Sequence, residues 1–123
     1  MATGISSSFD ITFDAAPLAA TEVATITNPG RTFTIVGVTA YGAATAVCLV
    51  GKGTVATVVA ESAALTATDT PELCEMLIAN LDNFTFASTD NIQISATTAA
   101  INKVVIHCVA GGLGEALTEV ITS

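Results

Sequence analysis

The sequence predicts a single all-β domain, and three observations support this fold class. Val, Ile and Thr together supply 42 of the 123 residues, and β-branched side chains suit a pleated sheet better than a helix. Several short segments alternate apolar and polar residues, which is the period of a half-buried strand. Turn residues separate these segments at short intervals. We therefore expect one β-sandwich over residues 1–123, jelly-roll-like, with at most one short helix.

The N-terminal part of the chain combines a polar stretch with a clear strand pattern. Residues 1–8 are small and polar, and we expect them to form a flexible N-terminal arm. The segment 8–14 then places Phe9, Ile11 and Phe13 on one face and polar residues on the other. Strict alternation of this kind predicts a strand with one buried face.

Further strands follow along the chain, separated by turn signals. They are predicted at 22–27, 31–41, 45–50, 54–61, 84–86, 91–96 and 103–110. The strongest turn signal is Asn28-Pro29-Gly30, between the first two of these segments. In 31–41, Phe33 and Ile35 share one face and Val36 the other, so we expect a central strand covered on both sides.

The segment 69–81 has a different period. Asp69 or Thr70 can cap a helix that Pro71 begins. The apolar residues that follow at helical spacing are Leu73, Met76, Leu77 and Leu81. A short helix is predicted, and a strand that uses Cys74, Met76 and Ile78 is the alternative. The acidic residues Asp69, Glu72 and Glu75 are expected to complement the dipole of this helix rather than to bind calcium.

Charge argues against a nucleic-acid partner. Eleven acidic residues stand against three basic ones, for a net charge of −8. Such a chain repels phosphate backbones, so we expect no nucleic-acid partner. With few charges, much of the surface must consist of Thr, Ser, Ala and Gly, either as a neutral coat or buried against sister subunits.

A membrane location is also not expected. The stretch 32–51 carries no charge and is long enough to span a bilayer. Thr residues punctuate it and Tyr41-Gly42-Ala43-Ala44 breaks it, so two strands joined by a turn explain it better. The first 30 residues contain no Lys or Arg and no continuous apolar core, and we expect no secretory signal there.

The residues able to carry chemistry form no catalytic or metal-binding pattern. Cys48, Cys74 and Cys108 show no CxxC spacing and have apolar neighbours, which predicts buried free thiols. His107 is adjacent to Cys108, but neighbours in a strand point to opposite faces. We expect a structural histidine, no catalytic or metal-ligating residue, no cofactor and no enzymatic activity.

Five segments carry a resemblance to a known family. They read GRTFTIVGVTAY (30–41), LVGKGT (49–54), PELCEMLIANL (71–81), NFTFASTDNIQIS (83–95) and VVIHCVA (104–110). In its order of strands and turns, about two-thirds of the chain resembles the small capsid cement, or decoration, proteins of tailed phages. The resemblance implies a jelly-roll or related β module, no catalytic residue, and a homotrimer that clamps neighbouring major capsid proteins. It also implies a place on the virion surface after synthesis in the host cytoplasm.

The face formed by Phe9, Ile11 and Phe13 is the candidate interaction site. These residues could reach a neighbouring subunit or the shell, or they could fill the core of their own chain. Two other functions remain open. A tail, spike or fibre subunit would bind a host receptor or glycan through the loops 63–70 and 97–102. An enzyme would have to use His107 with a distant carboxylate or thiol.

Overall fold

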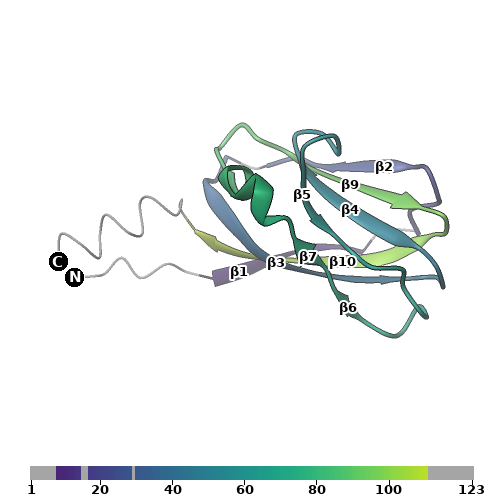
Figure 1. Ribbon diagram of the computed structural model, residues 1–123. Helices are drawn as coiled ribbons and strands as arrows, with labels where there is room; N and C mark the ends of the chain where they lie inside the picture. The colour runs from purple at the N-terminus through teal and green to yellow at the C-terminus, as the bar shows by residue number, and fades with distance from the viewer. Residues whose placement is uncertain (1–7, 15–16, 29, 111–123) are drawn as a thin grey trace, which may run out of the picture.

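The computed structural model describes residues 8–14, 17–28 and 30–110, whose strands form two antiparallel sheets packed together (Figure 1). One sheet has the order β1 (Ser8–Phe13), β10 (Ile101–Ala110), β3 (Phe33–Gly42) and β6 (Glu72–Leu73), with β8 (Thr85–Phe86) also paired to β3. The other has the order β2 (Val23–Ile26), β9 (Ile92–Thr97), β4 (Val47–Lys52), β5 (Val58–Glu61) and β7 (Glu75–Met76). A short 3-10 helix, η1 (Ile78–Asn83), follows β7. The predicted all-β sandwich is confirmed.

Strand pairing gives the connectivity of the sandwich. The pairs β4–β5, β3–β8, β2–β9 and β1–β10 are nested one outside the next along the chain. One long hairpin rolled into two sheets produces this pairing, and it is the connectivity of a jelly roll. Rolling also brings β10 beside β3 and β9 beside β4, which completes each sheet.

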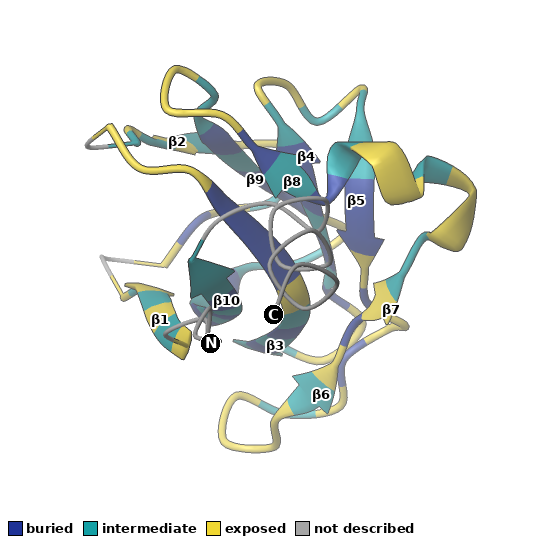
Figure 2. Cartoon of the chain, turned by 90° about the vertical axis from the view of Figure 1, so that its left-hand side faces the viewer, coloured by how far each residue is buried: buried dark blue, intermediate teal, exposed yellow. Residues whose placement is uncertain are grey.

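The core lies between the two sheets and follows the alternation read from the sequence. In β9, Ile92 and Ile94 are buried, and in β10 Val104, Ile106 and Cys108 are buried. Figure 2 shows buried stretches on strands of both sheets. The largest fully buried side chains are Phe33, Phe86, Ile35, Ile92, Ile94, Ile101, Ile106, Val38, Val50, Val59, Val104 and Thr34.

Strand β3 contains a bulge that the sequence did not predict. It is central in its sheet, as expected, but Val36 is 54% exposed while Ile35 and Val38 are fully buried. The register with β10 shifts between His107 and Cys108, so that β3 contains one extra residue. An extra residue reverses the side-chain alternation. The expectation that apolar residues cover both faces of this strand is therefore wrong.

The helix predicted over 69–81 is also wrong. Instead, β6 joins the edge of one sheet and β7 the edge of the other, so the chain crosses between the sheets at Cys74. The amide of Cys74 donates to the Val38 carbonyl, and that of Leu77 donates to Val59. Two sheet edges thus satisfy the backbone that a helix would have satisfied internally. The strand alternative is correct for 72–76, and the helical turns lie later, in η1.

The acidic residues of this segment consequently do not act on a helix dipole. Asp69 lies in an exposed loop, Glu72 in β6 and Glu75 in β7. The first turn of η1 contains no acidic residue. The interpretation of these three carboxylates as dipole partners is wrong because the helix does not begin there.

The uncharged apolar stretch 32–51 lies within the sandwich. As expected, the stretch 32–51 forms two strands, β3 and β4, joined by a turn. Thr45 in this turn has φ 70°. Within the part of the chain that is described, no helix is long and apolar enough to cross a bilayer. Residues 1–7 of the predicted arm and the segment 111–123 lie outside the described residues, and Ser8 already belongs to β1.

Candidate functional site

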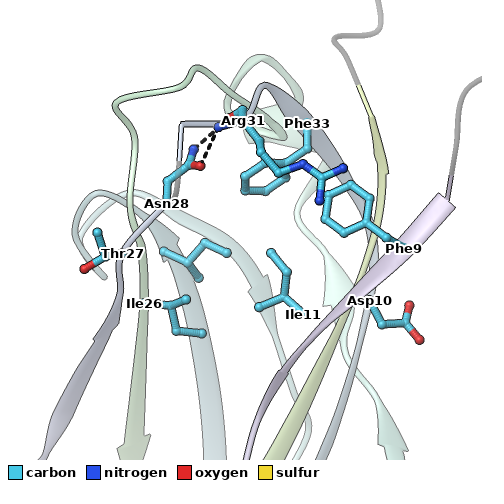
Figure 3. A pocket seen from close by; sticks show the side chains of 9 residues that line it. Phe9, Asp10, Ile11, Ile26, Thr27, Asn28, Arg31 and Phe33 are labelled. Carbon is cyan, nitrogen blue, oxygen red and sulfur yellow. Dashed lines mark hydrogen bonds between the residues drawn. The ribbon is translucent and has the colours of Figure 1, made fainter.

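A pocket of about 290 Å³ opens at one edge of the sandwich, between the two sheets (Figure 3). Strands β1 and β2 are the outermost strands of their sheets at this edge and do not pair with each other. The space between them is therefore not closed by backbone hydrogen bonds. The lining residues are Phe9, Asp10, Ile11, Ile26, Thr27, Asn28, Arg31, Phe33 and Ile92.

The walls of the pocket are apolar. Phe9 and Ile11 come from β1, Ile26 from β2, and Phe33 and Ile92 from the strands behind them. Alternate residues of a strand share a face, so the inward face of β1 supplies two of these walls. Figure 3 shows Ile11 and Ile26 facing each other across the opening.

A cation sits at one end of the pocket. The Arg31 guanidinium carbon lies 4.1 Å from the centre of the Phe9 ring. That ring meets Phe33 edge to face, with centroids 6.0 Å apart. A cation above an aromatic face is attracted by the negative charge of the π system. The aromatic contacts therefore help to hold the guanidinium beside the opening.

The turn before Arg31 is built around Asn28. Its Oδ1 accepts hydrogen bonds from the amides of Gly30 and Arg31, at 3.0 and 2.9 Å. Its Nδ2 donates to the carbonyls of Arg31 and Ala87. Gly30 has φ 101°, a conformation that favours glycine. The turn signal in the sequence is confirmed, and the closed hydrogen-bond network fixes the backbone position of Arg31.

The predicted interaction residues lie at or beside this pocket. Phe9 and Ile11 line it, and Phe13 follows on the same face of β1. All three are partly buried and pack against the core of their own chain. Their role in binding a partner stays a prediction. The sequence does not indicate Arg31, Asn28 and Ile26, because no local pattern shows that two edge strands, each paired only within its own sheet, enclose a space.

His107 lies outside the pocket, on the outer face of the first sheet. It is half-exposed, whereas Cys108 is 1% exposed, so the two point to opposite faces as expected. The strand register places Asp10 beside it, and its Nδ1 lies 3.0 Å from Asp10 Oδ1. Its Nε2 lies 3.0 Å from Thr39 Oγ1. Residues that are distant in sequence are brought together by pairing that the sequence pattern alone does not specify.

The polarity of this network follows from its donors and acceptors. An ionised carboxylate only accepts, so Nδ1 carries the hydrogen that is donated to Asp10. In the neutral ring Nε2 then accepts from the Thr39 hydroxyl. The order Thr39 hydroxyl, His107 imidazole, Asp10 carboxylate is the order of groups in the catalytic triad of hydrolases. Acyl transfer also needs a bound substrate beside the hydroxyl and donors for the oxyanion. The pocket lies on the inward side of β1, while Figure 3 shows the Asp10 carboxylate turned away from it.

We expect the His107→Ala substitution to lower the free energy of unfolding by less than about 1 kcal/mol. The side chains of His107 and Asp10 are 39% and 56% exposed, and exposed cross-strand pairs contribute little. Urea unfolding of the single variants and of the double variant with Asp10→Ala measures this contribution. A loss above about 2 kcal/mol would contradict it, since only buried networks reach that size.

The three cysteines are free and buried, as predicted. Interaction with the neighbouring Cys74 thiol, together with burial, raises the pKa of Cys48 well above its ordinary value. Burial, with a smaller contribution from the Asp10 charge, raises the pKa of Cys108 to about 12. The reactive form of cysteine is the thiolate, so Cys48 and Cys108 are held in their unreactive form at neutral pH.

Comparisons with protein-family models and with curated proteins give no match for this chain. Across residues 8–14, 17–28 and 30–110, no group of three His, Cys, Asp or Glu residues is arranged to hold a metal ion.

Proposed function

We propose that this protein is a capsid decoration protein, a structural subunit that binds the outer surface of a phage shell as a homotrimer and stabilises it. Its partners would be other copies of itself and the major capsid protein. The order of strands and turns that resembles small cement proteins supports this proposal, and so does the jelly-roll sandwich in which those strands lie.

The observation that carries the proposal is the exposure of three large apolar side chains along one side of the sandwich. Leu73, Ile78 and Leu81 are 75%, 70% and 44% exposed. They belong to the segment that runs from β6 through β7 to η1 along one side of the molecule (Figure 2). Exposed apolar surface of this kind is typical of protein–protein contacts. We name Leu73, Ile78 and Leu81 the apolar edge.

Charge supports the same function. Only 11% of the residues are charged, eleven acidic and three basic, so much of the surface is uncharged. A mostly uncharged surface with exposed apolar side chains suits repeated contacts with sister subunits and with a shell. Many weak contacts, multiplied by copy number, can stabilise a capsid without any single strong site.

The decisive experiment removes the protein from the particle. Capsids that lack it should assemble but break at a lower temperature, or under milder osmotic shock, than capsids that carry it. Equal fragility of the two kinds of capsid would reject the proposal. A location at one vertex instead of an even distribution over the shell would favour a tail, spike or fibre subunit.

The apolar edge can be tested with a matched pair of variants. The double variant Leu73→Glu, Ile78→Glu should lose the trimer, for which light scattering of the original protein should give three times 12.3 kDa. Two charges at a contact interface disrupt it strongly. The control Thr68→Glu, Ser88→Glu adds the same charge at exposed positions and should remain trimeric. A trimer that tolerates the edge variant would place the contact elsewhere.

A further inference from the structure

The pocket between β1 and β2 has the properties of a small-ligand site. Its volume is about 290 Å³, close to the lower limit of the pockets that usually hold small molecules. Its walls are the side chains of Phe9, Ile11, Ile26 and Ile92, with Phe33 behind them. An apolar chain or ring placed there would remove these side chains from water, which is favourable in proportion to the apolar area covered.

Of the described polar side chains at the opening, only Arg31 has a charge that is free to bind a ligand. The Asp10 carboxylate points away from the pocket and is bonded to His107 Nδ1 at 3.0 Å. The Asn28 side chain is occupied by the turn that it holds together. The Arg31 guanidinium rests on Phe9, and no carboxylate of the described residues forms a salt bridge with it.

Arg31 is the cation best placed to select a ligand in this acidic chain. The other two basic residues are engaged away from the pocket: Lys52 lies 3.7 Å from Asp90, and Lys103 stands over the Tyr41 ring. A guanidinium presents several N–H donors in one plane and can bind both oxygens of a carboxylate. Because the Phe9 ring covers one of its faces, its planar edge remains suited to such an anion.

From this arrangement we propose that the pocket binds a small carboxylate with an apolar body, such as a medium-chain fatty acid. The apolar chain lies between Ile11 and Ile26, and the carboxylate is held by Arg31 at the opening. Such a ligand would bind whether or not the protein coats a capsid, because no residue of the apolar edge takes part in the site.

Octanoate is the probe that tests this site on the full-length protein. Titration should shift the NMR signals of the labelled Ile11, Ile26 and Ile92 methyl groups, with saturation in the millimolar range or below. Ile101 provides an internal control, since it pairs with Gly42 and Leu18, outside the pocket, and its signal should not move. No saturable shift at millimolar octanoate would overturn the proposal.

The contribution of the ligand carboxylate and that of the space in the pocket are tested separately. Octan-1-ol has the same chain without the carboxylate and should bind at least about tenfold more weakly, as should octanoate to the Arg31→Gln variant. Lys103→Gln, which removes the other cation stacked on an aromatic ring, should bind octanoate unchanged. Ile26→Phe should block the pocket, and circular dichroism should show that each variant remains folded. Equal affinity for octanol and octanoate, or for Arg31→Gln and the original protein, would overturn the role of Arg31.

Discussion

The Phe86→Ala substitution should lower the free energy of unfolding by about 3–5 kcal/mol, the range for removing a large buried aromatic side chain. Phe86 is fully buried in β8 and lies opposite Phe33 of the neighbouring strand β3. Their rings stack with centroids 5.0 Å apart and an angle of 14° between the planes. The variant loses the free energy of burying the phenyl ring and the stacking contact with Phe33. It also leaves a cavity whose neighbours lose packing contacts.

Two further variants make this result interpretable in urea unfolding. Phe86→Leu retains much of the buried volume and should cost roughly 1–2 kcal/mol, which gives a folded protein even if the alanine variant unfolds. Val36→Ala lies on the same sheet at a position 54% exposed and should cost about 0.5 kcal/mol. If Phe86→Ala destabilised the protein no more than Val36→Ala, the stacked pair would not be part of the core.

The same aromatic pair connects the core to the candidate site. Phe86 stacks on Phe33, Phe33 meets Phe9, and Phe9 lies under Arg31. A cavity at Phe86 would remove support from Phe33, which forms the back of the pocket. The position of the proposed carboxylate-binding group therefore depends on packing that begins in the middle of the sandwich.

The strands that the sequence predicts well are those in which the inward-facing apolar residues recur at every second position. In 8–14, 91–96 and 103–110 the alternation is regular, and β1, β9 and β10 form there. Alternation shows which residues face inward, since a shift by one residue would expose all of them. Alternation does not show which strands pair, so the nested pairing of the jelly roll is seen only in the structure.

The failures have a common physical origin in irregular backbone. The bulge in β3 turns Val36 outward and Val38 inward, although both are equally apolar. The crossing at Cys74 lets a chain with helical spacing use the free edges of two sheets. In both places long-range hydrogen bonds decide the conformation, and a local pattern contains no information on them.

The candidate site was only partly predictable for the same reason. The sequence indicates Phe9 and Ile11 because they lie on an apolar face of a strand near the N-terminus. Arg31 directly follows the strongest turn in the chain and is one of only three basic residues in an acidic sequence, which is the signal that could have identified it. That it lies beside Phe9 follows from the pairing of β1, β10 and β3, which brings the ends of these strands together.

The Gly51→Ala substitution should have an effect nearly as large as Phe86→Ala, about 3 kcal/mol or somewhat more, from overpacking. A Cβ at Gly51 would lie 2.2 Å from the Thr54 carbonyl oxygen and 2.8 Å from the Val55 Cα. These are backbone atoms of the turn after β4, and the turn cannot move away easily. The Gly53 amide donates to the Asn91 carbonyl, and the Val55 amide donates to the Gln93 side chain, which ties the turn to β9.

Gly53 gives the matched control, because its backbone conformation favours glycine, whereas at Gly51 the lack of space for a Cβ does so. It has φ 74° and no atom within 4 Å of an added Cβ, so Gly53→Ala should cost only the left-handed conformation, roughly 1–2 kcal/mol. Asn tolerates that conformation, and Gly53→Asn should recover part of the loss, whereas Gly51→Asn should be at least as damaging as Gly51→Ala. Urea unfolding of the four variants separates the two causes. Equal recovery by Asn at both positions would mean that backbone conformation, and not the close approach of the turn, requires glycine at position 51.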